Sequence, residues 1–451
     1  MANTYLSRSE GAGNRKTFTL SAWCKRSSTG SSNTIFSSGT NSDNYFFIDF
    51  ANTNKFQCLD IGSGSYQIRM ETNRLIRDCN GFYHIVIAVD TTQSTASNRV
   101  KMYINGVQET SFSTATYPSQ NYDTNLNNSN TANIGRYVIE SSRYFDGVMS
   151  YVAFVDGQQL TPSTFGSTDA TTGEWKINTS PSVTYGTNGF FILKDGNSVT
   201  DQSGNSNNFT VGGGTLTKTE DCPDNVFCTL NPLIGFTSSY GEAHSNAPTY
   251  SLGNTKFTKS QATWSTQGCT LGASSGKYYW EAKMENNGGD PRLYIGIVDA
   301  EFIQGERGHV TGQTTNGVGY NSNNGKVKVS GGTDATYGNS FTSSDVVGCA
   351  LDLDNRKIYF HKNGTWQNSG DPTSGSTGTG SATTLTADRT YIPSFTIHNS
   401  GCLANFGNGY FGTTAVTTNS GNGYAGADGK SIFNYQPPTG YTALSTKGLN
   451  L

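Results

Sequence analysis

Short segments in which apolar and polar residues alternate recur along the whole chain, and this pattern limits the fold more than any other feature. The segment from Thr17 to Cys24 places Phe18, Leu20, Ala22 and Cys24 on one face of an extended strand. The same alternation returns at residues 82–90, 99–105 and 147–155, with Gly, Asn and Ser turns between the segments. No stretch longer than about ten residues shows a helical period. The pattern predicts an all-β chain built of antiparallel β-sandwiches.

One arrangement of strands and turns occurs twice. Residues 86–106 contain an apolar segment ending at Asp90, a polar loop and a second segment ending in Asn105-Gly106, and residues 346–364 repeat this order up to Asn363-Gly364. Asn-Gly readily adopts the positive φ angles of a tight hairpin turn. The repeat therefore predicts two sandwiches of related design.

The composition excludes several classes of protein. The 451 residues include 54 glycines without a collagen period, and aromatic residues reach 12%, which is too many for a disordered chain. The net charge of −3 offers no positive field for a phosphate backbone, so we expect no nucleic-acid partner. No apolar run is long enough to cross a membrane and the first residues lack a hydrophobic signal core, so we expect neither membrane insertion nor an export signal.

The eight cysteines contain no Cys-x-x-Cys pair, which argues against a structural zinc site. Most lie in apolar segments, so buried thiols are favoured over a disulfide framework. Cys222 and Cys228 are the exception, because the short loop between them could be closed by oxidation.

The first half of the chain resembles a laminin-G-like, concanavalin-type jelly roll. The residues that carry the likeness include 18–23, 83–90, 101–106, 133–136 and 145–154. In that family a strand followed by an Asp-x-Ser-Gly-Asn turn usually opens the domain, whereas here this element lies at residues 189–208, after the sandwich. The resemblance therefore implies a permuted order in which this element pairs beside the strand near Tyr5.

The second half resembles a SPRY domain, which is also a concanavalin-like sandwich. Matching segments occur in the family's order at residues 276–281, 294–298, 317–321, 345–352, 357–364, 391–395 and 405–407. We predict a jelly roll at residues 1–215, a connector at residues 216–232 that includes part of the glycine-rich stretch 212–224, and a SPRY-like sandwich at residues 233–451.

The two domains together, with the closing segment 433–441, are similar to structural proteins of bacteriophage particles. This resemblance implies a non-enzymatic tail fibre or appendage on the virion exterior, assembled in the host cytoplasm, with lectin-like surfaces for host glycans. Other virion proteins and further copies of the chain, as a trimer, are the implied partners. A capsid-bound decoration or head-fibre protein and a glycoside hydrolase are the alternatives.

The hydrolase alternative requires two carboxyl groups that face each other across a sugar. The nearest match to the Glu-x-Asp-x-Glu pattern is Glu281 to Glu285, which has Lys283 at the central position. Asp352 and Asp354 share a strand face, but they lie at a hairpin turn where Asp is favoured for backbone hydrogen bonding. The five histidines lack metal-ligand spacing, and His84 and His361 lie within predicted strands. We predict no catalytic residue.

Two kinds of binding site have candidate residues. The loop from Asp201 to Asn208 gathers hard oxygen atoms around a glycine turn, so Asp201, Ser203 and Asn205 are candidate calcium ligands, although an ordinary Asx-rich loop has the same composition. Exposed loops that combine aromatic rings, amides and carboxylates can contact a glycan or a protein partner. These candidates are Tyr122, Asp123, Asn286, Asn287, Asp290, Arg292, Tyr320 and Trp366.

Overall fold

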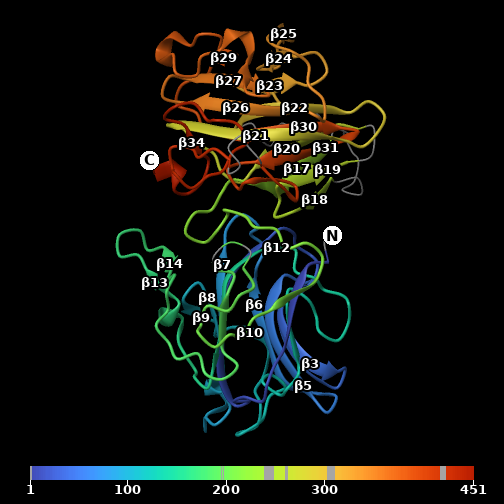
Figure 1. The fold of residues 1–451 in the computed structure, drawn as a ribbon, viewed down its shortest axis with the longest axis vertical. Helices are drawn as coiled ribbons and strands as arrows, with labels where there is room; N and C mark the ends of the chain where they lie inside the picture. The colour runs from blue at the N-terminus through green and yellow to red at the C-terminus, as the bar shows by residue number, and fades with distance from the viewer. Residues whose placement is uncertain are drawn as a thin grey trace. The chain divides into compact units, whose positions relative to one another are not determined.

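The computed structural model describes residues 3–194, 196, 198–237, 248–259, 263–301, 310–416 and 423–450. Within these residues the chain forms β-strands and a few short 3₁₀ turns, and it contains no α-helix (Figure 1). It divides into two compact units, Met1–Lys218 and Thr219–Leu451. None of the helical turns in the described part is long and apolar enough to span a membrane.

The first unit is a sandwich of an eight-stranded and a six-stranded sheet, both antiparallel. The larger sheet has the order β10 (Phe112–Thr116), β6 (Ser65–Leu75), β5 (Lys55–Gly62), β4 (Asn44–Phe50), β3 (Asn33–Asn41), β11 (Thr131–Ile134), β1 (Tyr5–Ser9) and β16 (Thr210–Gly213). The smaller sheet has the order β15 (Phe190–Ile192), β12 (Gly147–Asp156), β2 (Thr17–Arg26), β7 (Tyr83–Asp90), β8 (Val100–Ile104) and β9 (Val107–Gln108). A two-stranded hairpin, β13 (Gly166–Thr168) and β14 (Trp175–Ile177), stands beside these sheets (Figure 1).

The second unit is a sandwich of a seven-stranded and a nine-stranded sheet. The first has the order β17 (Leu230–Thr237), β20 (Ser265–Cys269), β30 (Tyr391–His398), β22 (Arg292–Asp299), β23 (Val318–Asn321), β24 (Lys326–Val329) and β25 (Ala335–Thr336). The second contains β18 (Thr249–Ser251), β19 (Lys256–Thr258), β31 (Ser400–Asn405), β21 (Lys277–Asn286), β26 (Val346–Asp352), β27 (Lys357–Lys362), β28 (Thr365–Trp366), β29 (Thr383–Thr384) and β34 (Thr442–Ala443). A separate hairpin joins β32 (Tyr410–Phe411) and β33 (Thr414–Ala415).

The short 3₁₀ turns lie in connections between strands or after the last one. They are η1 (Ala96–Asn98), η2 (Pro162–Thr164), η5 (Gln367–Ser369), η6 (Gly375–Thr377) and η7 (Gly448–Asn450).

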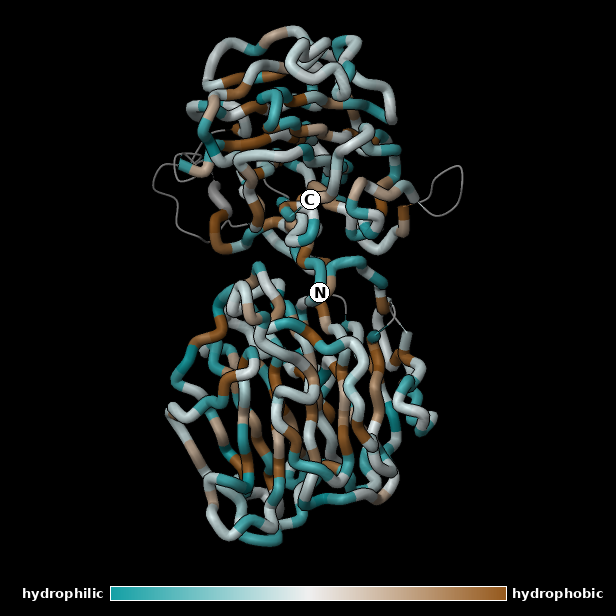
Figure 2. The backbone as a smooth tube through the Cα atoms, turned by 90° about the vertical axis from the view of Figure 1, so that its left-hand side faces the viewer, coloured by the Kyte–Doolittle hydropathy of each residue, from teal (hydrophilic) through white to brown (hydrophobic). Residues whose placement is uncertain are grey.

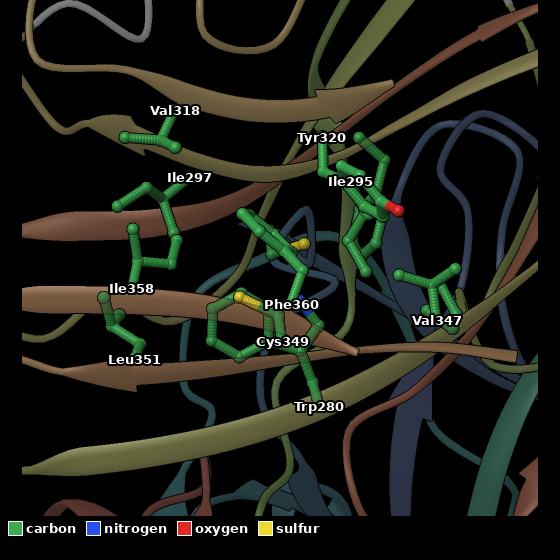
Figure 3. Close-up of a cluster of buried hydrophobic side chains, with 14 of the residues drawn as sticks. Trp280, Ile295, Ile297, Val318, Tyr320, Val347, Cys349, Leu351, Ile358 and Phe360 are labelled. Atoms are coloured by element: carbon green, nitrogen blue, oxygen red, sulfur yellow. The ribbon is translucent and has the colours of Figure 1, made fainter. Parts of the chain in front are cut away.

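The core of each unit lies between its two large sheets, as the alternation predicts. Apolar segments follow the strands in both units (Figure 2). In the second unit, side chains from β21, β22, β23, β26 and β27 interdigitate (Figure 3), and they include Trp280, Ile295, Ile297, Val318, Tyr320, Val347, Cys349, Leu351, Ile358 and Phe360. Each large apolar side chain that is fully buried stabilises the fold by about 1.5–3 kcal/mol. The prediction of two antiparallel concanavalin-like sandwiches in tandem is confirmed.

The repeated hairpin has the same hydrogen bonds in both units. The amide of His84 donates to Oδ1 of Asn105 and the amide of Asn105 donates back to the His84 carbonyl, each at 2.8 Å. Val346 and Asn363 make the same two bonds at the same distances. Both residues of each Asn-Gly corner have positive φ, which is the backbone of a type I′ turn. The repeat therefore reflects one local structure used twice.

The pairing predicted for the element at residues 189–208 is wrong. Its strand β15 pairs with β12 at an edge of the smaller sheet, and the strand beside Tyr5 is β16, with Tyr5 opposite Gly213. The glycine-rich stretch therefore supplies a strand. Glycine is needed here because a Cβ at Gly212 would lie 2.3 Å from the ring of Tyr5.

Residues 216–232, predicted as a connector, contain parts of the second unit's core. Phe227, Cys228 and Leu230 are at most 1% exposed. The amide of Cys228 donates to the carbonyl of Leu444, so this entering segment pairs with the end of the chain. The predicted domain limits themselves stay a prediction.

Candidate interaction surface

Four of the predicted contact residues lie together on the connection between β21 and β22. Asn286 and Asn287 are exposed, and Nη2 of Arg292 lies 2.6 Å from Oδ2 of the exposed Asp290. Glycines 288 and 289 have φ values of +97° and +66°, so the connection turns in a backbone conformation that favours glycine. These four side chains lie at the surface or its margin, and their part in partner contact stays a prediction.

A second connection lies against this one. Both β21–β22 and β30–β31 pass from one sheet to the other at the same end of the sandwich, because Arg292 is opposite His398 and Asn286 is opposite Ser400. Oγ of Ser400 donates to the carbonyl of Arg292 at 2.6 Å. This bond joins the two connections and limits their relative movement.

Trp264 completes the surface, and sequence reasoning did not identify it. It precedes β20, whose first residue pairs with Ile397, and this register brings the indole next to His398. The ring centroids of Trp264 and His398 are 4.8 Å apart. The ring centroids of Trp264 and Tyr294 are 5.8 Å apart, and these two rings pack edge-on. The indole is half-buried, so it combines a fixed position with an accessible apolar area. We call the set Trp264, residues 286–292 and His398 the β21–β22 surface.

Tyr320 does not belong to any surface, and its prediction as a contact residue is wrong. Its side chain is 0% exposed within the core, where its ring lies 5.3 Å from those of Phe341 and Phe360. Its hydroxyl donates to the carbonyl of Asn339. Tyr320 lies on the same face of β23 as Val318, which also belongs to the core, and this is the reason it cannot meet a partner.

Trp366 lies on a different strand, β28, at the edge of the nine-stranded sheet. Its ring packs edge-on against His361, with the ring centroids 5.0 Å apart. The ring centroid of Tyr435 lies 5.2 Å from that of the same imidazole. The half-buried Trp366 therefore covers a buried histidine and has a packing role. Its part in partner contact stays a prediction.

Tyr122 and Asp123 belong to the first unit and have separate surroundings. The Tyr122 hydroxyl donates to the buried carboxylate of Asp60 at 2.8 Å, whereas Asp123 is exposed and lies 4.0 Å from Nζ of Lys16. Burial raises the pKa of Asp60 to about 6, and hydrogen bonds from Asn125 and Tyr122 oppose this rise. Tyr122 is therefore committed to an internal hydrogen bond.

The loop proposed for calcium is held by its own hydrogen bonds. Oδ1 of Asp201 accepts from the amides of Phe191 and Ser203, and Oδ2 accepts from the Ser203 hydroxyl and the Asn207 amide, at 2.7–2.9 Å. The Asn205 amide group donates to two backbone carbonyls. Four donors directed at one carboxylate do not suit a cation, and the described residues contain no cluster of three His, Cys, Asp or Glu side chains suited to a metal. These residues fit an Asx-rich turn, and they do not fit a calcium site.

Glu281, the acid weighed for hydrolysis, is enclosed. It is 0% exposed, and its carboxylate accepts from the amides of Asn434 and Tyr435, the Tyr279 hydroxyl and the Asn405 side chain at 2.7–3.1 Å. Burial raises its pKa to about 7, and these four donors limit the rise. No sugar could reach this group in the folded unit.

His361 continues the same buried network. Its Nδ1 accepts from the amide of Gly364 at 3.1 Å, so Nε2 carries the proton of the neutral ring and donates to the Tyr279 hydroxyl at 2.6 Å. Burial lowers its pKa to about 3. His84 is also buried with a pKa lowered to about 3, whereas His244 and His309 lie outside the described residues.

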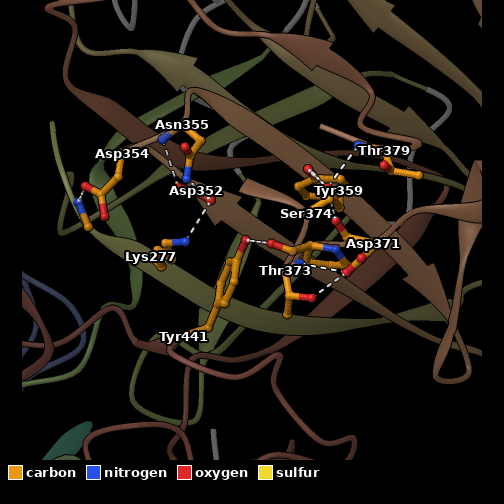
Figure 4. Close-up of polar contacts among 12 residues, drawn as sticks. Lys277, Asp352, Asp354, Asn355, Tyr359, Asp371, Thr373, Ser374, Thr379 and Tyr441 are labelled. Carbon is orange, nitrogen blue, oxygen red and sulfur yellow. Dashed lines mark hydrogen bonds and ion pairs between the residues drawn. The ribbon is translucent and has the colours of Figure 1, made fainter. Parts of the chain in front are cut away.

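The paired acids Asp352 and Asp354 serve a turn (Figure 4). Asp352 accepts from the amide and the side chain of Asn355 and lies 3.0 Å from Nζ of Lys277, while Asp354 accepts from the amide of Gly276. Since Asp352 is buried and fully partnered, the structure supports the backbone-bonding role expected for Asp at a hairpin turn.

All eight cysteines are free thiols. Seven are buried, and Cys222 is partly exposed with Sγ 2.8 Å from Oδ1 of Asp224. Burial and this neighbouring carboxylate raise the Cys222 pKa to about 12. Cys222 and Cys228 are not bridged.

Comparison with known proteins identifies a domain in each unit. Residues 2–164 match the profile of the Laminin_G_3 family, described as a concanavalin A-like lectin/glucanases superfamily, and residues 277–409 match the SPRY domain profile. Among solved structures, the SPRY domain of human HERC1 has a TM-score of 0.27 at 18% identity and covers 39% of this chain and 96% of its own. A pentraxin from Limulus polyphemus has a TM-score of 0.27 at 14% identity and covers 36% and 72%.

Proteins similar to part of the chain include animal Ran-binding proteins. Human Ran-binding protein 9 and zebrafish (Danio rerio) Ran-binding protein 10 are each 35% identical over 92 residues, which is 20% of this chain and 12% and 15% of theirs. Xenopus laevis Ran-binding protein 9 is 30% identical over 127 residues, or 28% and 22%. The chain thus spans less than a quarter of the length of these relatives.

These relatives correct the functional prediction. They are eukaryotic proteins named for binding another protein, so the prediction of a phage tail fibre for host adsorption, with a structural capsid decoration protein as its alternative, is wrong. That prediction rested on the order of two sandwich domains, and such a fold does not by itself specify a function. The chain combines a laminin-G-like concanavalin A-type domain in its first unit with a SPRY domain in its second.

Proposed function

We propose that the chain is a non-enzymatic protein-interaction module and that the β21–β22 surface of the SPRY unit contacts the partner. The name of the relatives describes binding of the protein Ran, and the proposal takes from it only the binding of a protein. The observation that carries the proposal is the half-buried Trp264, held by His398 and Tyr294 beside an exposed polar loop.

The chemistry of this surface suits a protein partner. Binding energy at protein interfaces concentrates in a few residues, with Trp, Tyr and Arg enriched among them. Trp264 offers a ring with little conformational freedom to lose, and Arg292 is aligned by Asp290. The exposed Asn286 and Asn287 provide amide donors and acceptors at the margin. This combination of an apolar anchor and a polar rim is typical of an interface.

A peptide selection on the full chain tests the proposal. Random peptides displayed on a surface would be selected against the wild-type protein and then measured by biolayer interferometry against Trp264→Ala and Arg292→Ala. We expect each substitution to weaken binding at least about thirtyfold, since hot-spot truncations cost about 2 kcal/mol or more. Lys357→Ala is the matched control, because Lys357 is opposite Asp352, which pairs with the first residue of β21, whereas Asn286 is the last residue of that strand.

Two results would contradict the proposal. Peptides that bind both surface variants as tightly as the wild type would place the binding site elsewhere. A selection that yields no specific binder would argue against a peptide-binding module. Circular dichroism of each variant shows that lost binding does not come from lost folding.

A further inference from the structure

Asn-Gly dipeptides are sites where a protein can modify itself. The glycine nitrogen can attack the asparagine side-chain carbonyl, because glycine has no Cβ to obstruct the approach and its backbone is the least restricted. The sequence contains nine such pairs, whose asparagines are residues 80, 105, 188, 287, 316, 324, 363, 408 and 422. Asn422 lies outside the described residues, and the other eight can be compared.

Six of these eight asparagines are held by hydrogen bonds to their side-chain oxygen. Asn105 and Asn363 accept from backbone amides within the repeated hairpin. Asn188 and Asn408 are buried and accept from other amides. The Oδ1 atoms of the remaining two, Asn316 and Asn324, accept from the Thr386 hydroxyl and the Lys326 amide. Each bond fixes the carbonyl that the glycine nitrogen would have to reach.

Asn80 and Asn287 lack such a bond, and burial separates them. Asn80 is half-buried and its Oδ1 is enclosed without a partner. Asn287 is exposed, and its side chain has no hydrogen-bond partner among the described residues. An atom added at the Cβ position of Gly288 would meet nothing within 4 Å, so the backbone has open space in which to move. Among the eight described pairs, only Asn287 combines a free side chain with solvent access.

One contact opposes the reaction at this position. The amide of Gly288 donates to Oδ1 of Asn286 at 2.9 Å in an exposed Asx-type turn. A side-chain acceptor at the surface can rotate away, and a single hydrogen bond of this kind contributes about 1 kcal/mol. Asn286 therefore delays the attack of the Gly288 nitrogen on the side chain of Asn287 without preventing it.

We propose that Asn287 is a site of spontaneous deamidation and that Asn286 sets its rate. The Gly288 nitrogen loses its proton to hydroxide and bonds to Cγ of Asn287, which closes a five-membered imide. The Cγ–Nδ2 bond breaks, and Nδ2 takes up a proton and leaves as ammonia. Water then opens the imide at either carbonyl, which gives aspartate or isoaspartate. Nothing is oxidised or reduced, and water is the only co-reactant.

The reaction changes the charge of the β21–β22 surface. Asp290 and Arg292 form an ion pair there, and a new carboxylate at position 287 adds a negative charge to the same connection. The isoaspartate product also lengthens the backbone of the connection by one carbon. The covalent step stands on the local geometry alone, and only its effect on partner binding rests on the proposed function.

Peptide mapping by mass spectrometry of the aged full-length protein tests the site. The protein is incubated at mildly alkaline pH, and conversion at each asparagine is followed over time in three forms: the wild type, Asn286→Ala and Asn287→Gln. We expect Asn287 to convert first among the eight described pairs. Asn286→Ala should speed this conversion about fivefold, the factor that corresponds to one lost hydrogen bond of about 1 kcal/mol. Asn287→Gln should stay unconverted, because its attack would need a larger ring.

Asn324 is the internal control, since it is also exposed but its Oδ1 accepts from the Lys326 amide. The proposal is overturned if Asn324 or Asn80 converts before Asn287, or if Asn286→Ala leaves the rate at Asn287 unchanged. Binding is measured separately with Asn287→Asp and the selected peptides. Conversion without any change in peptide binding would count against the proposed interaction surface and leave the modification site intact.

Discussion

The buried pair of Glu281 and His361 predicts an unusual dependence of stability on pH in the SPRY unit. Burial raises the pKa of Glu281 from 4.5 to about 7 and lowers that of His361 from 6.5 to about 3. Between pH 4.5 and 7 the folded unit holds a proton on Glu281 that the unfolded chain has lost, so this term adds stability as the pH falls and is lost as the pH rises through about 7. Between pH 3 and 6.5 the unfolded chain holds a proton on His361 that the folded unit has not bound, so this term removes stability as the pH falls.

The two terms cancel where their windows overlap. From pH 6.5 down to 4.5, folded and unfolded forms of this pair bind the same number of protons, so the pair contributes no slope. Glu281→Gln removes one term and leaves the other. A difference of one proton changes the free energy of unfolding by about 1.4 kcal/mol per pH unit, so the variant should lose about 3 kcal/mol relative to the wild type across this window.

Urea unfolding of the full chain at a series of pH values measures this difference. Subtracting the wild-type free energy of unfolding from that of the variant at each pH cancels the terms of the first unit. Hydrogen exchange of peptides from β21 and β27 assigns the effect to the second unit. Glu10→Gln is the matched control, because Glu10 is a buried carboxyl of the first unit whose pKa burial also raises to about 7.

A second variant should change the free energy of unfolding in the opposite direction. His361→Gln removes the opposing term, so its free energy of unfolding should rise relative to the wild type as the pH falls from 6.5 to 4.5. Parallel pH profiles of Glu281→Gln and the wild type would contradict the prediction, because Glu281 would then titrate in the folded unit as it does in the unfolded chain.

Three further predictions concern other parts of the chain. Gly106→Ala should lower the free energy of thermal unfolding by about 2–3 kcal/mol, because φ is +80° and the new Cβ would lie 2.5 Å from the Trp175 ring. The control Gly173→Ala, where φ is +74° and the space is open, should lower it by only about 1 kcal/mol. Equal losses in the two variants would rule out the ring contact as the cause. Asp201→Ala should destabilise the first unit by about 3 kcal/mol, since its carboxylate accepts four hydrogen bonds. The loss should be the same with added calcium and with a chelator. A loss that depends on calcium would restore the metal-site hypothesis. A thiol reagent should label only Cys222 in the native protein, and slowly, because its pKa is raised. In denaturant the reagent should label all eight cysteines. Fewer than eight labelled cysteines in denaturant without reductant would indicate a disulfide.

The sequence alone determined the fold class and the repeated hairpins. Alternation of period two fixes which side chains face a sheet's core, and Asn-Gly fixes a type I′ corner, so both signals act between residues that are close in the chain. The same locality placed Asn286, Asn287, Asp290 and Arg292 together on one connection.

The tertiary structure decided everything that depends on pairing between distant strands. The sequence predicts Tyr320 in an exposed connection, whereas its pairing with Ile295 and Val327 makes it part of β23 and buries it. Trp264 reaches His398 only because β20 pairs with β30, and no local pattern encodes that register. Glu281 acquires its raised pKa from burial in the closed sandwich, and only this tertiary structure brings to its carboxylate the donors, more than a hundred residues away along the chain, that limit the rise.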